Sequence, residues 1–504
     1  MKKAILSLLI ACMVTAGHAQ DHMHISSLWY GYNGIPISEI DSITYGELSH
    51  QDKLPALIAS DPNLSLFNEA LLLTHMDDSL VAYINYDWYI EPGKTTWWGR
   101  NPMLTLSYYK FTAFVEPNEV YARYGIHTID DLKAYAAKVY DEVYPEDAAI
   151  TDPTDRRNSL NRFVSYHFID RYATTANLVA LNTEVYRNYD REAVDIASWY
   201  ETLMPHSILR CSAPLLTEGE EQLYINRRGI QDRADERGVF VKGARITHSA
   251  STKNGVYHYI DDIIAYDKAT QDVALNQQII LTTTTLTPEL MNGEPQKEAF
   301  DGNTISYKIT PEMEMEDIRF SGLEEIWYSY APGFWSLDND ELVIEHRGGE
   351  VAISFDIPAV PAGEYELCLG CVITFGGGDR KIHFTFNGEA CGDSLLITQP
   401  MDLGWKSDAE LGSEQAIAEN DSLLYTFRWR KGLDYFYPDD EEKYKEYRMR
   451  DLQYTGRYVV TRFTSDGKSG NRLDVTMHSN SGFQFGIDFI ELCPTEIYEK
   501  KEPY

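Results

Sequence analysis

The sequence predicts an α+β domain followed by an all-β sandwich. Apolar positions between residues 48 and 268 recur at both helical and strand spacing. From residue 305 to residue 495, short alternating segments follow one another and are separated by Gly and Pro turns. Aromatic residues form 12% of the 504 residues, which allows sizeable cores despite a formal net charge of −34.

The first 19 residues have the layout of a secretory signal peptide. Lys2-Lys3 provides the positive start, and an apolar run follows from Ala4 to Val14. A second interpretation stays open, because Leu9 to Cys12 resembles a bacterial lipobox in which Cys12 would be lipidated. Both interpretations predict export, to the cell envelope or surface or into the medium. No later stretch is long and apolar enough to form a transmembrane segment.

Residues 20–47 are expected to form an N-terminal hairpin extension. Asn33-Gly34 separates two alternating runs, from Ile25 to Tyr32 and from Ile35 to Tyr45. Asn-Gly between two such runs favours a tight turn at these two residues.

Helices and strands are expected in turn across residues 48–268. Asp61-Pro62-Asn63 opens a helix in which Leu64, Phe67, Leu71 and Leu72 recur at helical spacing. Thr128 followed by Asp131 predicts a capped helix start. The expected strands and apolar stretches are Lys110–Val115, Asn161–Ile169, Val239–Val241, Arg245–Thr247 and Gly255–Ile264.

Residues 269–304 are expected to connect the two parts, with Thr282–Leu286 extended, and residues 496–504 form a tail. The sandwich strands are predicted at Glu341–Glu345, Glu350–Phe355, Tyr365–Phe375, Lys381–Phe386, Leu423–Trp429, Arg457–Thr461, Leu473–Met477 and Phe483–Leu492.

Three segments of the first part resemble the motifs of fasciclin domains. They are Thr112–Tyr121, Phe163–Ile169 and Asn254–Asp261, in the family's order. In the first, Val115-Glu116 departs from the Ala-Pro of the family pattern. The resemblance implies a fasciclin-like fold over residues 48–268 and an adhesion or binding module without a chemical step. The motif residues also have structural explanations: Asn118 can cap a turn, Asn254-Gly255 suits a turn with positive φ, and His167 and His258 fit a buried core.

The arrangement of the parts resembles that of Bacteroidetes surface proteins in which a jelly-roll or galactose-binding-like sandwich follows a fasciclin domain. Phe485–Leu492 is similar to the end of that sandwich. The resemblance implies a place at the outer membrane, beside nutrient-uptake machinery. The expected partner is therefore a glycan or an outer-membrane protein.

Composition and motifs argue against several other functions. The negative field disfavours nucleic acid as a partner. No nucleophile elbow, zinc-type His pair or phosphate loop appears, so we expect no catalytic residue, metal site or cofactor. Cys368 and Cys371 have CxxC spacing inside a predicted strand, which leaves buried thiols or one disulfide open.

Aromatic side chains in Gly- and Pro-containing segments are the candidate ligand-binding residues, because their flat faces suit sugars or protein partners. They are Trp88, Trp97, Trp98, Trp405, Tyr435 and Tyr437. The sequence thus predicts a non-enzymatic binding or adhesion protein. Two alternatives remain: a glycan hydrolase whose carboxylates are hidden among 78 acidic residues, and a fimbrial or matrix subunit.

Overall fold

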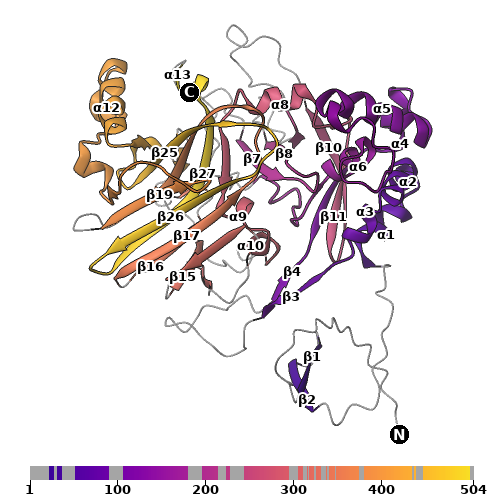
Figure 1. The fold of residues 1–504 in the computed structure, drawn as a ribbon, viewed down its shortest axis with the longest axis horizontal. Helices are drawn as coiled ribbons and strands as arrows, with labels where there is room; N and C mark the ends of the chain where they lie inside the picture. The colour runs from indigo at the N-terminus through magenta and orange to yellow at the C-terminus, as the bar shows by residue number, and fades with distance from the viewer. Residues whose placement is uncertain are drawn as a thin grey trace.

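A computed structural model of the chain shows an α+β part and a two-sheet β part side by side (Figure 1). The structure describes residues 22–27, 31–36, 52–89, 106–179, 196–213, 223–227, 243–293, 305–309, 315, 317–322, 325–330, 336–337, 340–346, 348–373, 380–433, 436–438 and 446–499.

The α+β part is built on a seven-stranded sheet. The strands run in the order β6-β5-β11-β10-β9-β8-β7 across the sheet, and β5 and β11 pair in parallel. Their bounds are β5 (Phe111–Val115), β6 (Phe168–Ile169), β7 (Ile196–Glu201), β8 (Ile208–Ala213), β9 (Tyr224–Ile225), β10 (Ala244–Thr252) and β11 (Gly255–Ile260). A separate arm pairs β3 (Ile84–Tyr89) with β4 (Leu106–Tyr108).

Helices gather on one side of this sheet (Figure 1). They are α1 (Leu54–Ser60), η3 (Pro62–Leu64), α2 (Ser65–Leu73), α3 (Met76–Ser79), α4 (Asn118–Arg123), α5 (Ile129–Val143), η4 (Pro145–Asp147) and α6 (Ser159–Tyr166). Both expected helix starts are confirmed. The Asp61 side chain accepts from the backbone N–H of Asn63, and Thr128 and Asp131 form a reciprocal capping box.

The second part consists of two facing sheets, as a sandwich requires. One sheet has the order β13-β15-β16-β27-β18-β25-β22 and the other β14-β17-β26-β19-β20. The bounds are β13 (Ile305–Ile309), β14 (Ile318–Ser321), β15 (Glu325–Tyr330), β16 (Asp340–His346), β17 (Gly349–Ile357), β18 (Gly363–Val372), β19 (Lys381–Phe386), β20 (Glu389–Ala390), β21 (Leu395–Leu396), β22 (Trp429–Lys431), β25 (Thr455–Ser465), β26 (Asn471–Ser479) and β27 (Phe483–Pro494).

A helical insertion leaves the sandwich between β21 and β22, at the edge farthest from the α+β part (Figure 1). It contains η7 (Pro400–Leu403), α11 (Asp408–Leu411) and α12 (Glu414–Thr426). The strand predicted at Leu423–Trp429 is therefore wrong over most of its length, because α12 continues to Thr426 and β22 begins at Trp429. The remaining elements are β23 (Phe436–Pro438), β24 (Glu446–Arg448), η8 (Met449–Asp451) and α13 (Thr495–Glu499).

The connecting region between the two parts is itself structured. It contains α8 (Lys268–Ala274), β12 (Ile279–Thr282), α9 (Thr283–Leu286) and α10 (Pro288–Gly293). β12 pairs with β27, so the sandwich sheet gains a strand from this region. The extended conformation predicted for Thr282–Leu286 is wrong, since Thr282 caps a short helix by accepting from the N–H of Thr285.

Two predicted turns also differ from the structure. β1 (His22–Ser27) and β2 (Gly31–Pro36) do form a hairpin, but Ser27 pairs with Gly31, so Asn33 and Gly34 lie inside β2 and not at the turn. Strand β2 covers the start of the second predicted run as far as Pro36, and the remainder of that run, to Tyr45, lies outside the described residues.

The second wrong turn is the one predicted at Asn254-Gly255. The β10–β11 turn consists of Lys253 and Asn254, because Thr252 pairs with Gly255, and neither Asn254 nor Gly255 has a positive φ. Gly255 is required for a different reason. A Cβ there would lie 2.7 Å from the carbonyl oxygen of Phe111, so close packing on β5 selects glycine.

Candidate functional site

Six side chains of the α+β part form a continuous series of ring contacts that we call the lysine–tyrosine patch. They are Lys53, Tyr83, Tyr108, Lys110, Tyr172 and Lys253. The ammonium nitrogens of Lys53 and Lys253 lie 4.3 and 5.6 Å from the centre of the Tyr83 ring. The Tyr83 and Tyr108 rings are 5.1 Å apart. These distances are within the range of cation–π attraction and aromatic packing.

Lys110 extends the patch at the other end. Its ammonium nitrogen lies 5.5 Å from the Tyr108 ring and 5.0 Å from the Tyr172 ring. Lys253 is exposed, whereas Tyr83, Tyr108 and Tyr172 are half-buried, so ring surface remains accessible beside the cations.

Asn254, one of the fasciclin motif residues, assembles one end of the patch. Its side-chain oxygen accepts from the N–H of Leu54 at 2.8 Å, and its side-chain nitrogen donates to the carbonyls of Leu80 and Ala82 at 2.7 and 3.0 Å. Leu54 follows Lys53, and Ala82 precedes Tyr83. A buried amide beside Lys253 therefore holds three distant segments together.

Lys53 and Lys253 carry the charge at one end of the patch. Burial, and then the nearby charge of Lys253, hold the pKa of Lys53 below its usual value, while Asp52 acts in the opposite direction. Among the residues that the structure describes, no carboxylate lies within ion-pair distance of Lys53 or Lys253. Burial also raises the pKa of Tyr83, so its hydroxyl stays neutral. Two like charges thus share one ring in a chain with a net charge of −34.

One of the predicted tryptophans lies on the arm formed by β3 and β4, and two more fall between these strands in the sequence. Trp88 belongs to β3, which begins directly after Tyr83, but its side chain lies outside the described residues. Trp97 and Trp98 also lie outside them, between β3 and β4. Tyr83 and Tyr108 of the patch therefore flank these three candidate binding residues in the sequence.

The other predicted site residues are placed elsewhere. Tyr437 lies in β23, without a described side chain, and Tyr435 and Cys12 lie outside the described residues. Trp405 is half-buried beside η7 and packs against the hydrophobic core. Its indole nitrogen is buried, with no hydrogen-bond partner among the described atoms. Its ring is thus not the freely exposed face that the sequence suggested.

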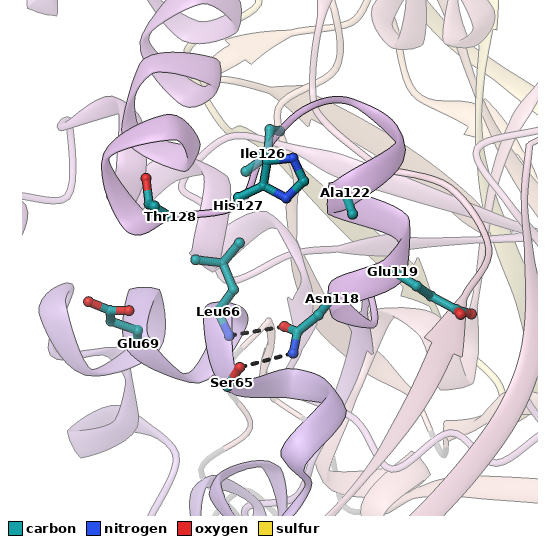
Figure 2. Close-up of a pocket in the computed structure, with 9 residues that line it drawn as sticks. All are labelled: Ser65, Leu66, Glu69, Asn118, Glu119, Ala122, Ile126, His127 and Thr128. Carbon is teal, nitrogen blue, oxygen red and sulfur yellow. Dashed lines mark hydrogen bonds between the residues drawn. The ribbon is translucent and has the colours of Figure 1, made fainter.

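A surface hollow of about 450 Å³ lies between α2, α4 and the start of α5 (Figure 2). Asn118 forms part of its wall. Instead of capping a turn next to itself, it accepts from the N–H of Leu66 at 3.1 Å and donates to Ser65 Oγ at 2.9 Å, so it ties α4 to the start of α2. Glu69 and Glu119 line opposite sides, and their carboxylates point away from each other in Figure 2. This is not the facing pair of carboxyls that glycoside hydrolysis uses.

The motif histidines are buried and hydrogen-bonded through both ring nitrogens. Nδ1 of His167 lies 2.7 Å from the carbonyl of Phe163, and its Nε2 lies 2.9 Å from the Glu116 carboxylate. Glu116, the departure from the family pattern, also accepts from Tyr121 and from the N–H of Ile264. His167 and Glu116 thus have hydrogen-bond partners for all their side-chain polar atoms, as in a buried structural network.

His258 is similarly enclosed. Its Nδ1 lies 2.6 Å from Ser249 Oγ and its Nε2 lies 2.7 Å from the carbonyl of Ala173. Burial lowers the pKa of His258 to about 4, so the ring is neutral at pH 7.

Neither the cysteines nor the acidic groups of the described chain form a metal or redox centre. Cys211, Cys368, Cys371, Cys391 and Cys493 are free thiols. Burial raises the pKa of Cys368 and Cys371, which makes these thiols unreactive. No group of three or more His, Cys, Asp or Glu side chains in the described ranges could hold a metal ion. Within the same ranges, no helix combines the length and apolarity needed to cross a bilayer.

No protein-family model and no curated protein matches the sequence. Among solved structures, the chain is similar to a GH87 α-1,3-glucanase catalytic domain in complex with nigerose, at 10% identity and a TM-score of 0.18 over 43% of this chain. It is also similar to a family 35 carbohydrate binding module from Clostridium thermocellum, at 11% identity and a TM-score of 0.17, over 43% of this chain and 98% of that one.

A third similar structure is the catalytic unit of a GH87 α-1,3-glucanase from Streptomyces thermodiastaticus, at 12% identity and a TM-score of 0.18 over 38% of this chain. The match spans only 28% and 26% of the two glucanase chains. The neighbours are carbohydrate-acting proteins, but at these TM-scores the likeness supplies no argument about this chain. The fasciclin resemblance stays a prediction.

Sequence reasoning missed the lysine–tyrosine patch. Its members come from segments that are up to 200 residues apart, and only Tyr108 and Lys110 are near neighbours in the chain. The sequence marked Asn254 only as a turn residue, and its role in the patch became visible with the structure, where its amide is fully buried and hydrogen-bonded.

Proposed function

We propose that the protein is an exported, non-enzymatic binding protein that holds an anionic glycan at the lysine–tyrosine patch. The observation that supports it is the sharing of the Tyr83 ring by the ammonium groups of Lys53 and Lys253, with no carboxylate of the described chain in ion-pair range. Mutual repulsion of two such groups is relieved when an anionic group binds between them.

The tyrosine rings of the patch favour a sugar as the uncharged part of the ligand. A sugar ring offers C–H groups that pack on a half-buried tyrosine face, while its carboxylate or sulfate pairs with the lysines. The proposal assigns Tyr83 and Tyr108 to the sugar and Lys253 to the charge. Because the rest of the chain is strongly acidic, the bulk field opposes this ligand, and we expect its affinity to depend steeply on the local lysines.

A matched pair of ligands tests the proposal. We expect a galacturonate oligosaccharide to bind the purified protein and its methyl ester, which has the same rings without the charge, to bind at least about tenfold more weakly. Lys253→Met should weaken the galacturonate by about tenfold, and Tyr83→Ala should weaken both ligands. Lys133→Met is the control, since Lys133 pairs with Asp130 on α5, away from the patch.

Equal binding of acid and ester, or an equal loss in the Lys133→Met control, would contradict the assignment of charge recognition to this patch. Absence of binding by any uronate or sulfated oligosaccharide would remove the proposal altogether. Release of reducing ends from any of them would favour a hydrolase instead.

A further inference from the structure

The helical insertion of the sandwich presents an apolar surface outward. Met401, Leu423 and Phe427 are 49%, 43% and 45% exposed, although each is a large apolar residue. We call these three side chains the α12 face. Leu423 and Phe427 are four residues apart and so lie on one side of the helix end. A Cβ on Gly404 would lie 3.2 Å from Leu423, so the η7 turn that carries Met401 ends beside Leu423.

Two buried ionic networks hold this helix rigidly on the sandwich. Asp408 accepts from Lys431 at 2.8 Å and from Arg450 at 3.0 Å, and Arg450 also pairs with Asp421 of α12 at 2.7 Å. On the other side, Tyr425 of α12 donates to the buried carboxylate of Glu366 at 2.9 Å. The C-terminal half of α12 is therefore fixed on the sandwich at Asp421 and Tyr425, while Leu423 and Phe427 remain exposed.

Exposed acidic side chains outnumber exposed cations in the helical insertion, and two of them adjoin the α12 face. Within residues 400–427, all of which the structure describes, four carboxylates are exposed: Asp402, Glu410, Glu414 and Glu419. Lys406 is the exposed cation of the same stretch. Glu419 lies one turn before Leu423, and Asp402 follows Met401. The apolar centre thus has a negative rim.

We propose that the α12 face is a docking surface for another protein that presents apolar side chains flanked by lysine or arginine. An apolar centre with a complementary charged rim is the usual anatomy of a protein interface. A second copy of this chain is disfavoured as the occupant, because it would bring a net charge of −34 against the same acidic rim. The rigid mounting of α12 lowers the entropic cost of binding.

This surface differs from the proposed glycan site. The α12 face lies at the edge of the sandwich farthest from the α+β part (Figure 1). A protein that binds a glycan with one part and a protein partner with the other would link the two, yet each surface can be tested without the other.

A defined peptide serves as the probe. We expect a fluorescent amphipathic peptide of leucine and lysine to bind the full chain, and the same peptide with glutamate in place of lysine to bind at least about tenfold more weakly. Leu423→Ser and Phe427→Ser should each weaken the lysine peptide by about tenfold. Leu72→Ser is the matched control, because Leu72 is 51% exposed on α2 and should change the affinity less than about twofold.

Three outcomes overturn the inference. Equal binding of the lysine peptide to the unmodified protein and to the Leu423→Ser variant would show that general acidity attracts it. If a peptide of the same composition with its leucines in scrambled order bound as tightly as the lysine peptide, general acidity would again be the cause of binding. Sedimentation that reveals a dimer, abolished by Leu423→Ser, would assign the face to a second copy. Melting curves confirm that each variant is folded.

Discussion

At the scale of single residues, the motif side chains of the α+β part act as structural ties. Asn254 joins three segments, Asn118 joins α4 to α2, and His167 bonds to Glu116. Each is a polar group whose burial requires partners, and each finds them far away in the chain. The residues that carry the fasciclin resemblance thus stabilise the fold. Asn254 is the one among them that also positions residues of the proposed site.

His258 provides a pH test of this view. Its pKa in the folded protein is about 4, against 6.5 as its ordinary value, so the unfolded chain binds the extra proton between these two pH values. Stability contributed by the neutral ring is complete above pH 6.5 and is lost as the pH falls towards 4. At about 1.4 kcal/mol for each pKa unit, the loss is about 3 kcal/mol.

The measurement is urea unfolding of the unmodified protein and of His258→Gln at pH 7 and pH 4.5. The variant should be the less stable of the two at pH 7, and the difference between them should shrink by about 2–3 kcal/mol at pH 4.5. His127→Gln, at an exposed position of the hollow, should show no such change. A constant difference at both pH values would mean that His258 is not held neutral by the fold.

At the scale of elements, caps predicted some helix starts correctly, but one capped helix was missed. Asp61 and Thr128 marked helix starts, because a cap is an interaction within four residues. Leu423–Trp429 was predicted as a strand because Tyr425, Phe427 and Trp429 alternate, yet α12 runs to Thr426. Its start is also capped locally, since Ser413 accepts from the N–H of Ala416, and tertiary contacts of Tyr425 with Glu366 and of Asp421 with Arg450 hold its C-terminal half.

A substitution of Asp408 tests how much the ionic contacts of the helical insertion contribute to stability. Asp408→Asn removes one of the two carboxylates that Lys431 and Arg450 share, and the half-buried Asp421 remains at 3.6 and 2.7 Å from them. We expect the free energy of unfolding to fall by about 2 kcal/mol, because charge-assisted hydrogen bonds of two buried cations are weakened while Asp421 still compensates part of their charge. Urea unfolding measures it, with Asp402→Asn on the exposed η7 turn as the control. A loss below about 1 kcal/mol would show that the network is solvated.

At the scale of the whole molecule, the region between the two parts acts as a shared structural element. Arg171 donates to the carbonyl of Thr285 at 2.6 Å. Asn292 accepts from the N–H of Tyr172 at 2.8 Å and donates to the carbonyl of Asp170 at 3.0 Å. Because β12 also pairs with β27, this region is attached to both parts at once.

Limited proteolysis tests this attachment. Residues 282–292 are buried throughout, so we expect chymotrypsin to leave Leu286 and Leu290 uncut in the native protein. Asn292→Ala removes both bonds to the α+β part and should raise the cleavage rate there by about tenfold or more, through easier local opening. Asn276→Ala, at an exposed position just before β12, is the control and should leave that rate unchanged. Rapid cleavage of the unmodified protein within 282–292 would mean that the region is a simple linker.

Hydrophobic period and capping are local properties, so the α+β and β halves, most of the strands and two capped helix starts could be predicted from the chain alone. Sequence reasoning also indicated that Asn254 and the two histidines are structural. The folded chain was needed to see that lysines and tyrosines from Lys53 to Lys253 meet, and that α12 carries apolar residues on its outer side. Contacts between residues 100 or more positions apart produce no periodic pattern in the sequence. Two lysines that lack an ion-pair partner among the described residues can therefore be recognised only when their neighbours in space are known.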